Sequence, residues 1–421
     1  MSLADRYKES IALTTQSRKV TPYGAQTASK QPSRFPEGAY PAYLQQGDGA
    51  RVQDVDGNWY VDYIVGLGAV PLGYNHAAVS EAISLQLEKG LISASLPTEL
   101  EEQIASQLVS IIPCAQDHGQ VRFVKTGSEA CAAAVRIARR ATGRDLVIVV
   151  GYHGWHDWVM VTSDPHPGIP AAMEGGFYGG FEFPIVARVP YNDTGRIEDL
   201  MRSHKVAAVM LEPTLLEAPK ENYLSDVVTL CTLHGAVSIF DEMVTGFRWA
   251  RAGGQEYFGI SPDLSTFGKG LANGMPLACV VGPERLLRYA DVISGTFGGE
   301  CLSLAAAGAV LDAYEDGAII RAQWHDGDVF QAYLQFLDIP HTGYSVHPKI
   351  TYTGAEMALF LQETARRGLL LHPAGLNISA ALTSEDMDLT YRALKGAKEA
   401  MEQGVRLEGI IPPTSLFRRN T

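Results

Sequence analysis

The chain has 421 residues, of which 46% are hydrophobic and 19% are charged. This balance excludes a disordered chain and leaves ample apolar surface for a large core. With 34 Lys and Arg against 47 Asp and Glu, the formal net charge is −13, which disfavours nucleic acid as a partner. The length predicts two domains, or one large domain with a smaller one attached.

Neither a membrane span nor an export signal is expected. No apolar run approaches the roughly 18–20 residues of a membrane helix, and the N-terminal stretch MSLADRYKESIALTTQ has no apolar signal-peptide core. The cysteines are scattered and form no Cys-x-x-Cys pair, which disfavours a disulfide framework and structural zinc. We therefore expect a cytoplasmic protein.

The N-terminal part of the chain is polar. Residues 1–45 are rich in turn-forming residues and predict an irregular arm with little core of its own. Residues 50–64 alternate in polarity around Asp56 and Gly57, a pattern typical of a β-hairpin.

Short apolar segments then alternate with helical patterns. Strands are expected at 121–124, 146–150, 206–211, 236–240, 264–267 and 278–281, and helices at 77–89, 98–110, 128–141, 222–233 and 302–314. This alternation predicts an α/β fold with a mainly parallel sheet covered on both faces. Further strands at 349–352 and 377–381, with helices at 355–367 and 384–403, indicate a smaller α+β domain.

Ligands bind such sheets beyond the carboxyl ends of the strands, so the residues after each strand matter most. After 121–124, Gly127 permits a close backbone approach and Ser128 offers a hydroxyl at the start of a helix. The free N–H groups and the dipole of a helix N-terminus favour a phosphate. An ordinary capped helix start would explain the same residues.

An aromatic residue follows the next strand. Tyr152 lies beside glycines and can stack on a planar ring, although a packed aromatic loop is the plainer interpretation. His153 and His156 lie close by, but no neighbouring set of carboxylates and histidines completes a metal site. No metal is predicted.

Two carboxylates end buried strands. Asp241 follows the strand at 236–240, where a carboxylate needs a partner such as a protonated heterocyclic nitrogen or a structural arginine. Glu212 follows 206–211 in the same way, and a hydrogen-bonded structural role explains it equally well.

A single lysine, Lys269, lies between glycines after the strand at 264–267. In an apolar setting, burial lowers the pKa of a lysine and frees its amine for Schiff-base chemistry. An ordinary surface lysine is the alternative.

Two other glycine-rich tracts do not support a dinucleotide site. The doubled glycines at 175–180 follow no expected strand, and Gly66-Leu67-Gly68 lacks a third glycine that opens a helix.

Four of these signals together match the needs of pyridoxal 5'-phosphate. In chain order they are the helix start at Gly127 and Ser128, Tyr152, Asp241 and Lys269. The phosphate needs a helix N-terminus, the ring a stacking face, the pyridine nitrogen an anion, and the aldehyde a lysine. The sequence also resembles the class III aminotransferases, within them the branch of glutamate-1-semialdehyde 2,1-aminomutase. The resemblance covers residues 48–310 and resumes at about 349–400, and is carried by DVDGNWYVDY, KTGSEACAAAVRIARRATGRD, GYHGWHD, IFDEMVTGFR, FGKGLANGMPLACVVG and SGTFGGE.

The resemblance implies the fold type I architecture of pyridoxal-phosphate enzymes, with a seven-stranded sheet in the large domain. Residues 1–59 would form an N-terminal arm and part of the small domain, 60–315 the large cofactor domain, and 316–421 the C-terminal part of the small domain. It also implies a homodimer with active sites at the interface.

Matching the motifs one by one implies residue roles. Lys269 would form the internal aldimine and shuttle the proton, and Asp241 would pair with the pyridine nitrogen. Gly127 and Ser128 would bind the phosphate. Further contacts would come from Tyr152 stacking on the ring, from Thr296 reaching the phosphate of the neighbouring subunit, and from Glu212 and His153 in supporting roles.

Some stretches depart from the aminomutase pattern. Residues 371–379 (LHPAGLNIS) are shorter and lack the glutamate of the family's loop, Leu67 stands where an aromatic is usual, and 320–348 is divergent. We therefore predict an aminotransferase that moves an amino group from an amino acid or amine to a carbonyl acceptor. An aminomutase or racemase is the first alternative, and a catalytically inactive binding protein the second.

The substrate contacts are less well defined. Arg34 could clamp a substrate carboxylate, with Lys30 as a rival. A surface role explains both residues equally well.

Overall fold

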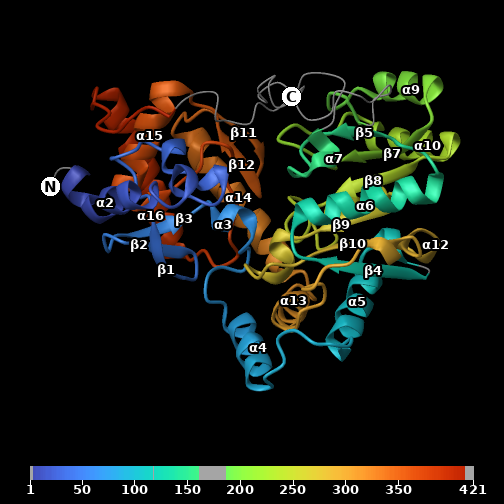
Figure 1. Cartoon of the computed structure of the whole chain (residues 1–421). Helices are drawn as coiled ribbons and strands as arrows, with labels where there is room; N and C mark the ends of the chain where they lie inside the picture. Colours follow the sequence, from blue (N-terminus) through green and yellow to red (C-terminus); the bar gives the residue numbers. More distant parts are fainter. Residues whose placement is uncertain (1–2, 117, 161–185, 413–421) are drawn as a thin grey trace. The chain divides into compact units, whose positions relative to one another are not determined.

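The computed structural model describes residues 3–116, 118–160 and 186–412 (Figure 1). The chain divides into two compact units. One comprises the described residues of Met1–His76 and Arg321–Arg418, and the other those of Ala77–Ile320. The first unit thus draws on both ends of the chain. The domain boundaries expected at 59/60 and 315/316 stay a prediction.

The unit formed by the middle of the chain contains a seven-stranded sheet in the order β4-β10-β9-β8-β7-β5-β6. Its strands are β4 (Gly119–Val124), β5 (Leu146–Val150), β6 (Val186–Arg188), β7 (Val206–Leu211), β8 (Val237–Asp241), β9 (Leu264–Phe267) and β10 (Ala278–Pro283). All neighbours pair in parallel except β10, which is antiparallel to both β4 and β9. The predicted mainly parallel α/β sheet is confirmed.

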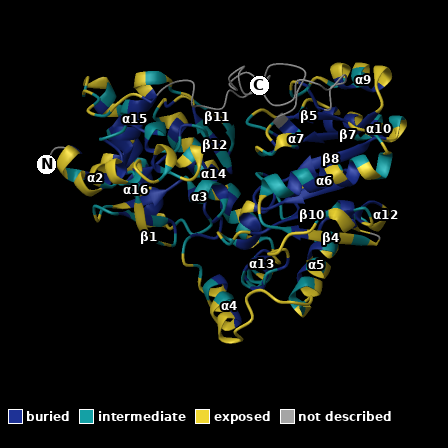
Figure 2. Cartoon of the chain, viewed as in Figure 1, coloured by how far each residue is buried: buried dark blue, intermediate teal, exposed yellow. Residues whose placement is uncertain are grey.

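Helices cover both faces of this sheet. The helix α6 (Gly127–Thr142) packs Ala134 and Ile137 against one face. On the other face, α9 (Thr194–Ser203) and α10 (Tyr223–His234) pack against the alternate strand residues. Every residue of β5, β7 and β8 is therefore buried, as the dark blue strands in Figure 2 show. This double burial explains the nearly continuous apolar composition of these strands.

The five helices predicted for this unit are confirmed to within a residue at each end. Besides α6 and α10 they are α4 (Ala77–Glu88), α5 (Glu99–Ile111) and α13 (Cys301–Ala313). Shorter elements are α7 (Asp157–Met160), α11 (Gly254–Phe258), α12 (Glu284–Leu287), η4 (Pro113–Ala115), η5 (Lys269–Ala272) and η6 (Ala290–Val292). The helix α14 (Ala318–Phe336) begins at the end of this unit, and neither it nor α9 was predicted.

The unit formed by the chain ends contains a four-stranded sheet in the order β1-β2-β3-β13. These strands are β1 (Leu44–Asp48), β2 (Arg51–Asp54), β3 (Trp59–Asp62) and β13 (Leu369–Leu370), and β11 (His341–Tyr344) pairs separately with β12 (His347–Ile350). The β2–β3 pair is the predicted hairpin, in which Gly57 adopts a φ of +84° in the turn. The helices are α1 (Leu3–Arg6), α2 (Lys8–Ser17), η1 (Pro22–Gly24), η2 (Ala28–Lys30), η3 (Pro32–Arg34), α3 (Val65–Gly68), α15 (Gly354–Arg366) and α16 (Ser384–Glu402).

Two expectations for this unit are wrong. Residues 377–381 form no strand, because Asn377 N–H donates to Tyr63 O and Ala380 N–H to Pro71 O, which lie on different segments. The N-terminal arm is also not irregular throughout, because it contains the helices α1 and α2, and its residues Leu3 and Tyr7 are buried in the hydrophobic cluster of this unit. A pattern read within the arm could not show this, since the rest of that cluster comes from distant segments.

Among the described residues, no helix combines the length and the apolar character that crossing a membrane requires. The glycine tract at 175–180 lies outside the described residues.

Candidate active site

The predicted site residues of the middle unit gather at one edge of its sheet. His153 follows β5, Glu212 follows β7, Asp241 ends β8 and Lys269 follows β9. These four strands are successive parallel neighbours, so their carboxyl ends lie at the same edge. The order of the strands therefore brings together residues that are far apart in the sequence.

Asp241 is the buried anion of this edge, with 2% of its surface exposed. Its Oδ1 accepts hydrogen bonds from Met243 N at 3.1 Å and Thr266 Oγ1 at 3.3 Å. Its Oδ2 lies 2.8 Å from His153 Nδ1 and 3.3 Å from Cys131 Sγ. Burial by itself raises the pKa of Asp241, but the hydrogen bond and charge of His153 hold that pKa below its ordinary value. Asp241 is therefore ionised.

His153 lies between two groups that only accept hydrogen bonds. Its Nε2 is 3.0 Å from Val150 O, and its Nδ1 faces the Asp241 carboxylate. Both partners accept, so a ring nitrogen that carries a proton can donate to either of them. The imidazole thus holds one side of the Asp241 carboxylate.

Cys131, His153 and Asp241 form a cluster that the sequence did not predict. Their ligand atoms lie within 4.8 Å of one another, the kind of grouping that can hold a metal ion. Metal ligation needs a neutral imidazole and a thiolate. Both ring nitrogens of His153 already face hydrogen-bond acceptors, and burial raises the pKa of the Cys131 thiol well above its ordinary value. The cluster is better described as a hydrogen-bond network around Asp241.

Lys269 begins η5 in the left-handed region, with a φ of +46°. It is exposed, although Gly268 and Gly270 on either side are buried. The expectation of a lysine in an apolar setting is therefore wrong. Burial of the glycines reflects the packing of their backbone and leaves the Lys269 residue itself exposed. Its charge acts to lower the pKa of Glu212.

The N-terminus of α6 presents an anion site. Thr126 and Glu129 form a capping box, and Glu129 Oε2 accepts from the backbone N–H groups of Lys125 at 2.7 Å and Thr126 at 2.9 Å. The N–H groups of the next two residues, Gly127 and Ser128, have no partner among the described residues. Two free amides at the positive end of a helix of this length suit a phosphate.

Met243 connects this anion site to the lysine. A Cβ atom built on Gly127 would lie 2.7 Å from Met243 Sδ, and one built on Gly268 would lie 2.8 Å from the same sulfur. Both backbones thus touch one thioether, and any side chain at either position would collide with it. Since Met243 N–H also binds Asp241, the anion site, the buried carboxylate and Lys269 form a single site.

Glu212 and Tyr152 shape the opposite side of this edge. Tyr152 N–H donates to Glu212 Oε1 at 2.9 Å, and the Tyr152 ring is 44% exposed. Burial, followed by the charge of Asp241, raises the pKa of Glu212. At the end of the same loop, Gly154 lies so close to α6 that a Cβ atom there would be 2.4 Å from Ser128 Oγ. The loop is thus fixed at both ends.

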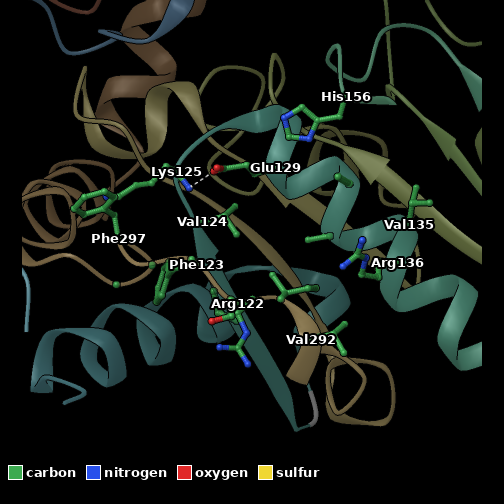
Figure 3. A pocket seen from close by; sticks show the side chains of 18 of the residues that line it. Arg122, Phe123, Val124, Lys125, Glu129, Val135, Arg136, His156, Val292 and Phe297 are labelled. Atoms are coloured by element: carbon green, nitrogen blue, oxygen red, sulfur yellow. Dashed lines mark hydrogen bonds between the residues drawn. The ribbon is translucent and has the colours of Figure 1, made fainter. Parts of the chain in front are cut away.

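Thr296 lies apart from this cluster of contacts, on the exposed stretch 294–298. It lines a pocket of about 1030 Å³ together with Lys125, Glu129, Trp155 and Phe297. Figure 3 shows this pocket, with the hydrogen bond between Lys125 and Glu129 on its wall.

The two predicted substrate residues belong to the unit formed by the chain ends. Lys30 is exposed in η2. Arg34, in η3, is half-buried, and its Nε donates to Ala28 O at 3.1 Å.

Three contacts of Asp241 were not predicted: Cys131, Thr266 and Met243. Thr266 had a signal in principle, since it is the register partner of Asp241 between β8 and β9. The signal for Cys131 was weaker: it lies one helical turn after Gly127, on the expected helix. The buried side chain that Cys131 contacts depends on how α6 packs on the sheet.

Comparison with known proteins identifies the family. The family model described as Aminotransferase class-III matches residues 35–387. The chain belongs to the class III aminotransferase family. Accordingly, this class III aminotransferase is an enzyme dependent on pyridoxal 5'-phosphate. The family assigned from the sequence motifs is confirmed.

Several relatives of this class III aminotransferase are similar over most of their length. It is 30% identical to the 3-aminobutyryl-CoA aminotransferase of Cloacimonas acidaminovorans, over 93% of this chain and 98% of that one. It is 36% identical to the glutamate-1-semialdehyde 2,1-aminomutase of Archaeoglobus fulgidus, over 67% of this chain and 69% of that one. The structure of the FumI protein of Sphingopyxis sp. MTA144, in its PLP internal aldimine form, superposes with a TM-score of 0.84 at 26% identity, covering 94% of this chain and 97% of that one.

The site has the donor set that pyridoxal phosphate requires. The free amides of Gly127 and Ser128 suit its phosphate, and the ionised Asp241 suits a protonated ring nitrogen. Lys269 is the amine at the same edge. The residues present therefore fit the cofactor.

Proposed function

We propose that the chain is an aminotransferase that moves an amino group from an amino acid or amine to a carbonyl acceptor, with Lys269 as the lysine that holds the cofactor. One observation carries this proposal. The ionised carboxylate of Asp241 ends β8, and Lys269 follows the adjacent parallel strand β9. Met243 N–H binds that carboxylate, and the Met243 sulfur lies close to the backbones of Gly268, next to Lys269, and of Gly127, at the free amides of α6. This is the arrangement that an anion-bearing, protonated heterocycle with a reactive carbonyl would need.

The binding roles follow from the geometry. The amides of Gly127 and Ser128 would hold the phosphate, and the exposed ring of Tyr152 would stack on the heterocycle. Asp241, held by the His153 imidazole, would keep the ring nitrogen protonated. When bound, pyridoxal phosphate supplies an electron sink that stabilises negative charge on the α-carbon of the donor.

Lys269 would also move the proton. Its neutral Nζ would take the proton from the donor α-carbon as a general base. The same nitrogen then returns a proton as a general acid. Glu212, whose carboxylate receives the N–H of Tyr152, would fix the loop that carries the stacking ring.

Replacement of the lysine tests this proposal. Lys269→Ala should abolish covalent attachment of pyridoxal phosphate, measured by mass spectrometry after borohydride reduction, and should lower turnover by several orders of magnitude. Lys205→Ala, at an exposed position directly before β7, is the matched control and should keep both. Undiminished turnover in Lys269→Ala would disprove the assignment.

Two observations support transfer between two substrates over isomerisation of one. The relative that matches 98% of its own length is named an aminotransferase. The segment 371–379 also contains no carboxylate, unlike the glutamate-bearing loop of the aminomutase branch. Turnover should therefore require both an amino donor and a carbonyl acceptor.

An aminomutase is the second candidate, since a relative at 36% identity bears that name. Incubation of purified enzyme with one amino substrate and no acceptor separates the two. Catalytic isomerisation under these conditions would favour the aminomutase, whereas a single half-turnover that stops would favour the aminotransferase.

We also propose a homodimer. Large apolar side chains are exposed on α4, on the segment after it and beside Thr296, namely Leu85, Leu91, Ile92 and Phe297. Thr296 would then reach the phosphate bound by the partner subunit. Sedimentation velocity should give twice the chain mass of 45.5 kDa, and Phe297→Asp should weaken the dimer.

Arg34 is the proposed substrate residue, with Lys30 as its rival. Arg34→Ala should raise KM for a carboxylate substrate more than Lys30→Ala does, because an arginine binds a carboxylate through two parallel hydrogen bonds.

A cytoplasmic location is also proposed. It is supported by five cysteines that are all free and buried. Fractionation of cells expressing a tagged chain tests it.

A further inference from the structure

The thiol of Cys131 reaches the carboxylate at the centre of the site. Cys131 lies in the second turn of α6 and is 1% exposed. Its Sγ is 3.3 Å from Asp241 Oδ2 and 3.8 Å from Thr266 Oγ1. Both distances are within the range of hydrogen bonds to sulfur.

The direction of the bond to Asp241 is determined by chemistry. An ionised carboxylate only accepts hydrogen bonds, so the sulfur must donate its proton. Burial, followed by the charge of Asp241, raises the pKa of the Cys131 thiol well above its ordinary value. The thiol therefore keeps the proton that it donates.

Cys131 differs in this respect from the other four cysteines, which are also buried. Cys114 bonds to the Ser265 hydroxyl and to a backbone carbonyl, and Cys301 to the Thr98 hydroxyl. Cys231 lies on α10, on the other face of the sheet. Of the five thiols, that of Cys131 bonds to a carboxylate.

We propose that Cys131 is a positioning residue, which acts on the cofactor through Asp241. Backbone and Thr266 donors hold Oδ1, while His153 and Cys131 hold Oδ2, so that the plane of the carboxylate cannot rotate about the Cβ–Cγ bond. The thiol thus keeps Asp241 ionised and oriented toward the ring nitrogen. This inference rests on the proposed role of Asp241.

Three variants separate this role from simple packing. Cys131→Ala removes the donor, and Cys131→Ser replaces it with a hydroxyl. Cys231→Ala is the matched control, because it deletes an equally buried thiol on the opposite face. Each holoenzyme is reconstituted with ¹⁵N-labelled pyridoxal phosphate. The readouts are the ring-nitrogen chemical shift across pH, the cofactor dissociation constant and thermal unfolding.

In Cys131→Ala, the ring nitrogen should lose its proton at a lower pH than in the wild type. The cofactor dissociation constant should rise on the order of threefold to tenfold, and kcat should fall more than KM changes. Cys131→Ser should return these values most of the way to the wild type. Cys231→Ala should unfold at a lower temperature but leave the ring nitrogen and the dissociation constant unchanged.

Two results would overturn the proposal. One is a Cys131→Ala holoenzyme that differs from Cys231→Ala in nothing but its unfolding temperature. The other is a Cys131→Ser enzyme as impaired as Cys131→Ala. If Cys131→Ala does not fold, the S–H stretching band of the wild type decides. It should lie at a lower frequency for Cys131 than for Cys231, and equal frequencies would refute the hydrogen bond.

Failure of the proposed function would look different. In that case the wild-type enzyme itself would show no protonated ring nitrogen and no covalent link to Lys269, whatever occupies position 131.

Discussion

Lys125 Nζ donates a hydrogen bond to Glu300 Oε1 at 2.8 Å, and the two side chains are only 18% and 10% exposed. The same nitrogen donates to Pro276 O at 3.0 Å and lies 3.3 Å from Ser303 Oγ. Lys125 lies two residues before Gly127 of the anion site, Glu300 follows the stretch that carries Thr296, and Pro276 lies in the loop that begins at Lys269. The Lys125 ammonium group thus binds to all three segments that would surround the cofactor.

Removing this cation should loosen all three segments. We expect Lys125→Met to lower the free energy of unfolding by roughly 2 kcal/mol, because it leaves the largely buried Glu300 carboxylate without its partner. The dissociation constant for pyridoxal phosphate should rise as well. Urea unfolding measures the first effect and cofactor titration the second.

The control is Arg202→Met, which breaks the exposed pair with Glu198, whose side chains are 69% and 39% exposed. Its cost should stay below about 0.5 kcal/mol. If Lys125→Met were no more costly than this control, the ion pair would have no role in holding the site.

The same ion pair predicts a dependence of stability on pH. Burial by itself raises the pKa of Glu300, but the hydrogen bonds from Lys125 and Ser303 and the charge of Lys125 hold that pKa below its ordinary value. A carboxyl whose pKa is lower in the folded state stabilises the fold above its unfolded pKa, near 4.3, and loses this contribution as the pH falls through the folded value. Glu300→Gln should therefore show a shallower loss of stability in acid than the wild type. Parallel acid titrations of unfolding would contradict this.

The sequence predicted the large sheet and its site edge well, because both depend on local patterns. Strands buried on both faces are continuous apolar runs. The residue after each run is a candidate for binding a ligand, and this inference needs only the local sequence. This is why Asp241, Glu212 and Lys269 could be placed at one edge before any coordinates. The start of α6 was also predicted to within a residue, although the capping box of Thr126 and Glu129 that fixes it was not.

What the sequence could not show are contacts that depend on packing between distant segments. Cys131 and Asp241 are 110 residues apart, and their contact requires α6 to lie on a particular face of β8. The exposure of Lys269 was missed because glycines beside it suggested burial of the whole segment. Residues 377–381 have the composition of a strand, but their backbone groups bind loops.

The close approach of Gly154 to α6 should be essential to the anion site. Gly154 has a φ of +91°, and a Cβ atom there would lie 2.4 Å from Ser128 Oγ and 2.9 Å from Ser128 Cα. Gly154→Ala should therefore combine backbone strain with displacement of Ser128. We expect a loss of roughly 2–3 kcal/mol in unfolding free energy and weaker cofactor binding.

Gly143→Ala isolates the backbone contribution. Gly143 has a φ of +66° at the end of α6, but nothing lies within 4 Å of a Cβ atom built there. This variant should cost about 1 kcal/mol and bind the cofactor as the wild type does. Equal cofactor affinity in both variants would exclude a role for Gly154 in the anion site.

Neutralising Asp241 should impair the chemistry without removing the lysine. Asp241→Asn keeps the size of the side chain but removes the anion that would stabilise the protonated ring nitrogen. We expect turnover to fall on the order of 10²–10³-fold, while borohydride still traps the cofactor on Lys269. Asp263→Asn, which alters a carboxylate bonded to Ser238 and Arg285, should affect stability alone. Full activity of Asp241→Asn would refute its role.

The residue after Asp241 predicts a second pH dependence, of opposite sign to that of Glu300. Glu242 is fully buried, and its carboxylate accepts from the backbone N–H groups of Gly254 at 2.6 Å and Gln255 at 2.9 Å. Burial outweighs these bonds and raises the pKa of Glu242 to about 7. The folded state thus keeps a proton that the unfolded chain releases near pH 4.3.

Because the folded state binds more protons between these two values, unfolding free energy should fall as the pH rises from about 4.5 to 7, and level off above it. Glu242→Gln has no proton to lose and should abolish this decline, although it is less stable throughout because its amide faces the Gly254 N–H. Glu256→Gln, an exposed neighbour on α11, should keep the wild-type profile. Urea unfolding at half-unit pH steps measures the difference between variant and wild type. A difference that does not change between pH 5 and pH 7 would show that Glu242 folds already ionised, stabilised by its backbone donors despite its burial.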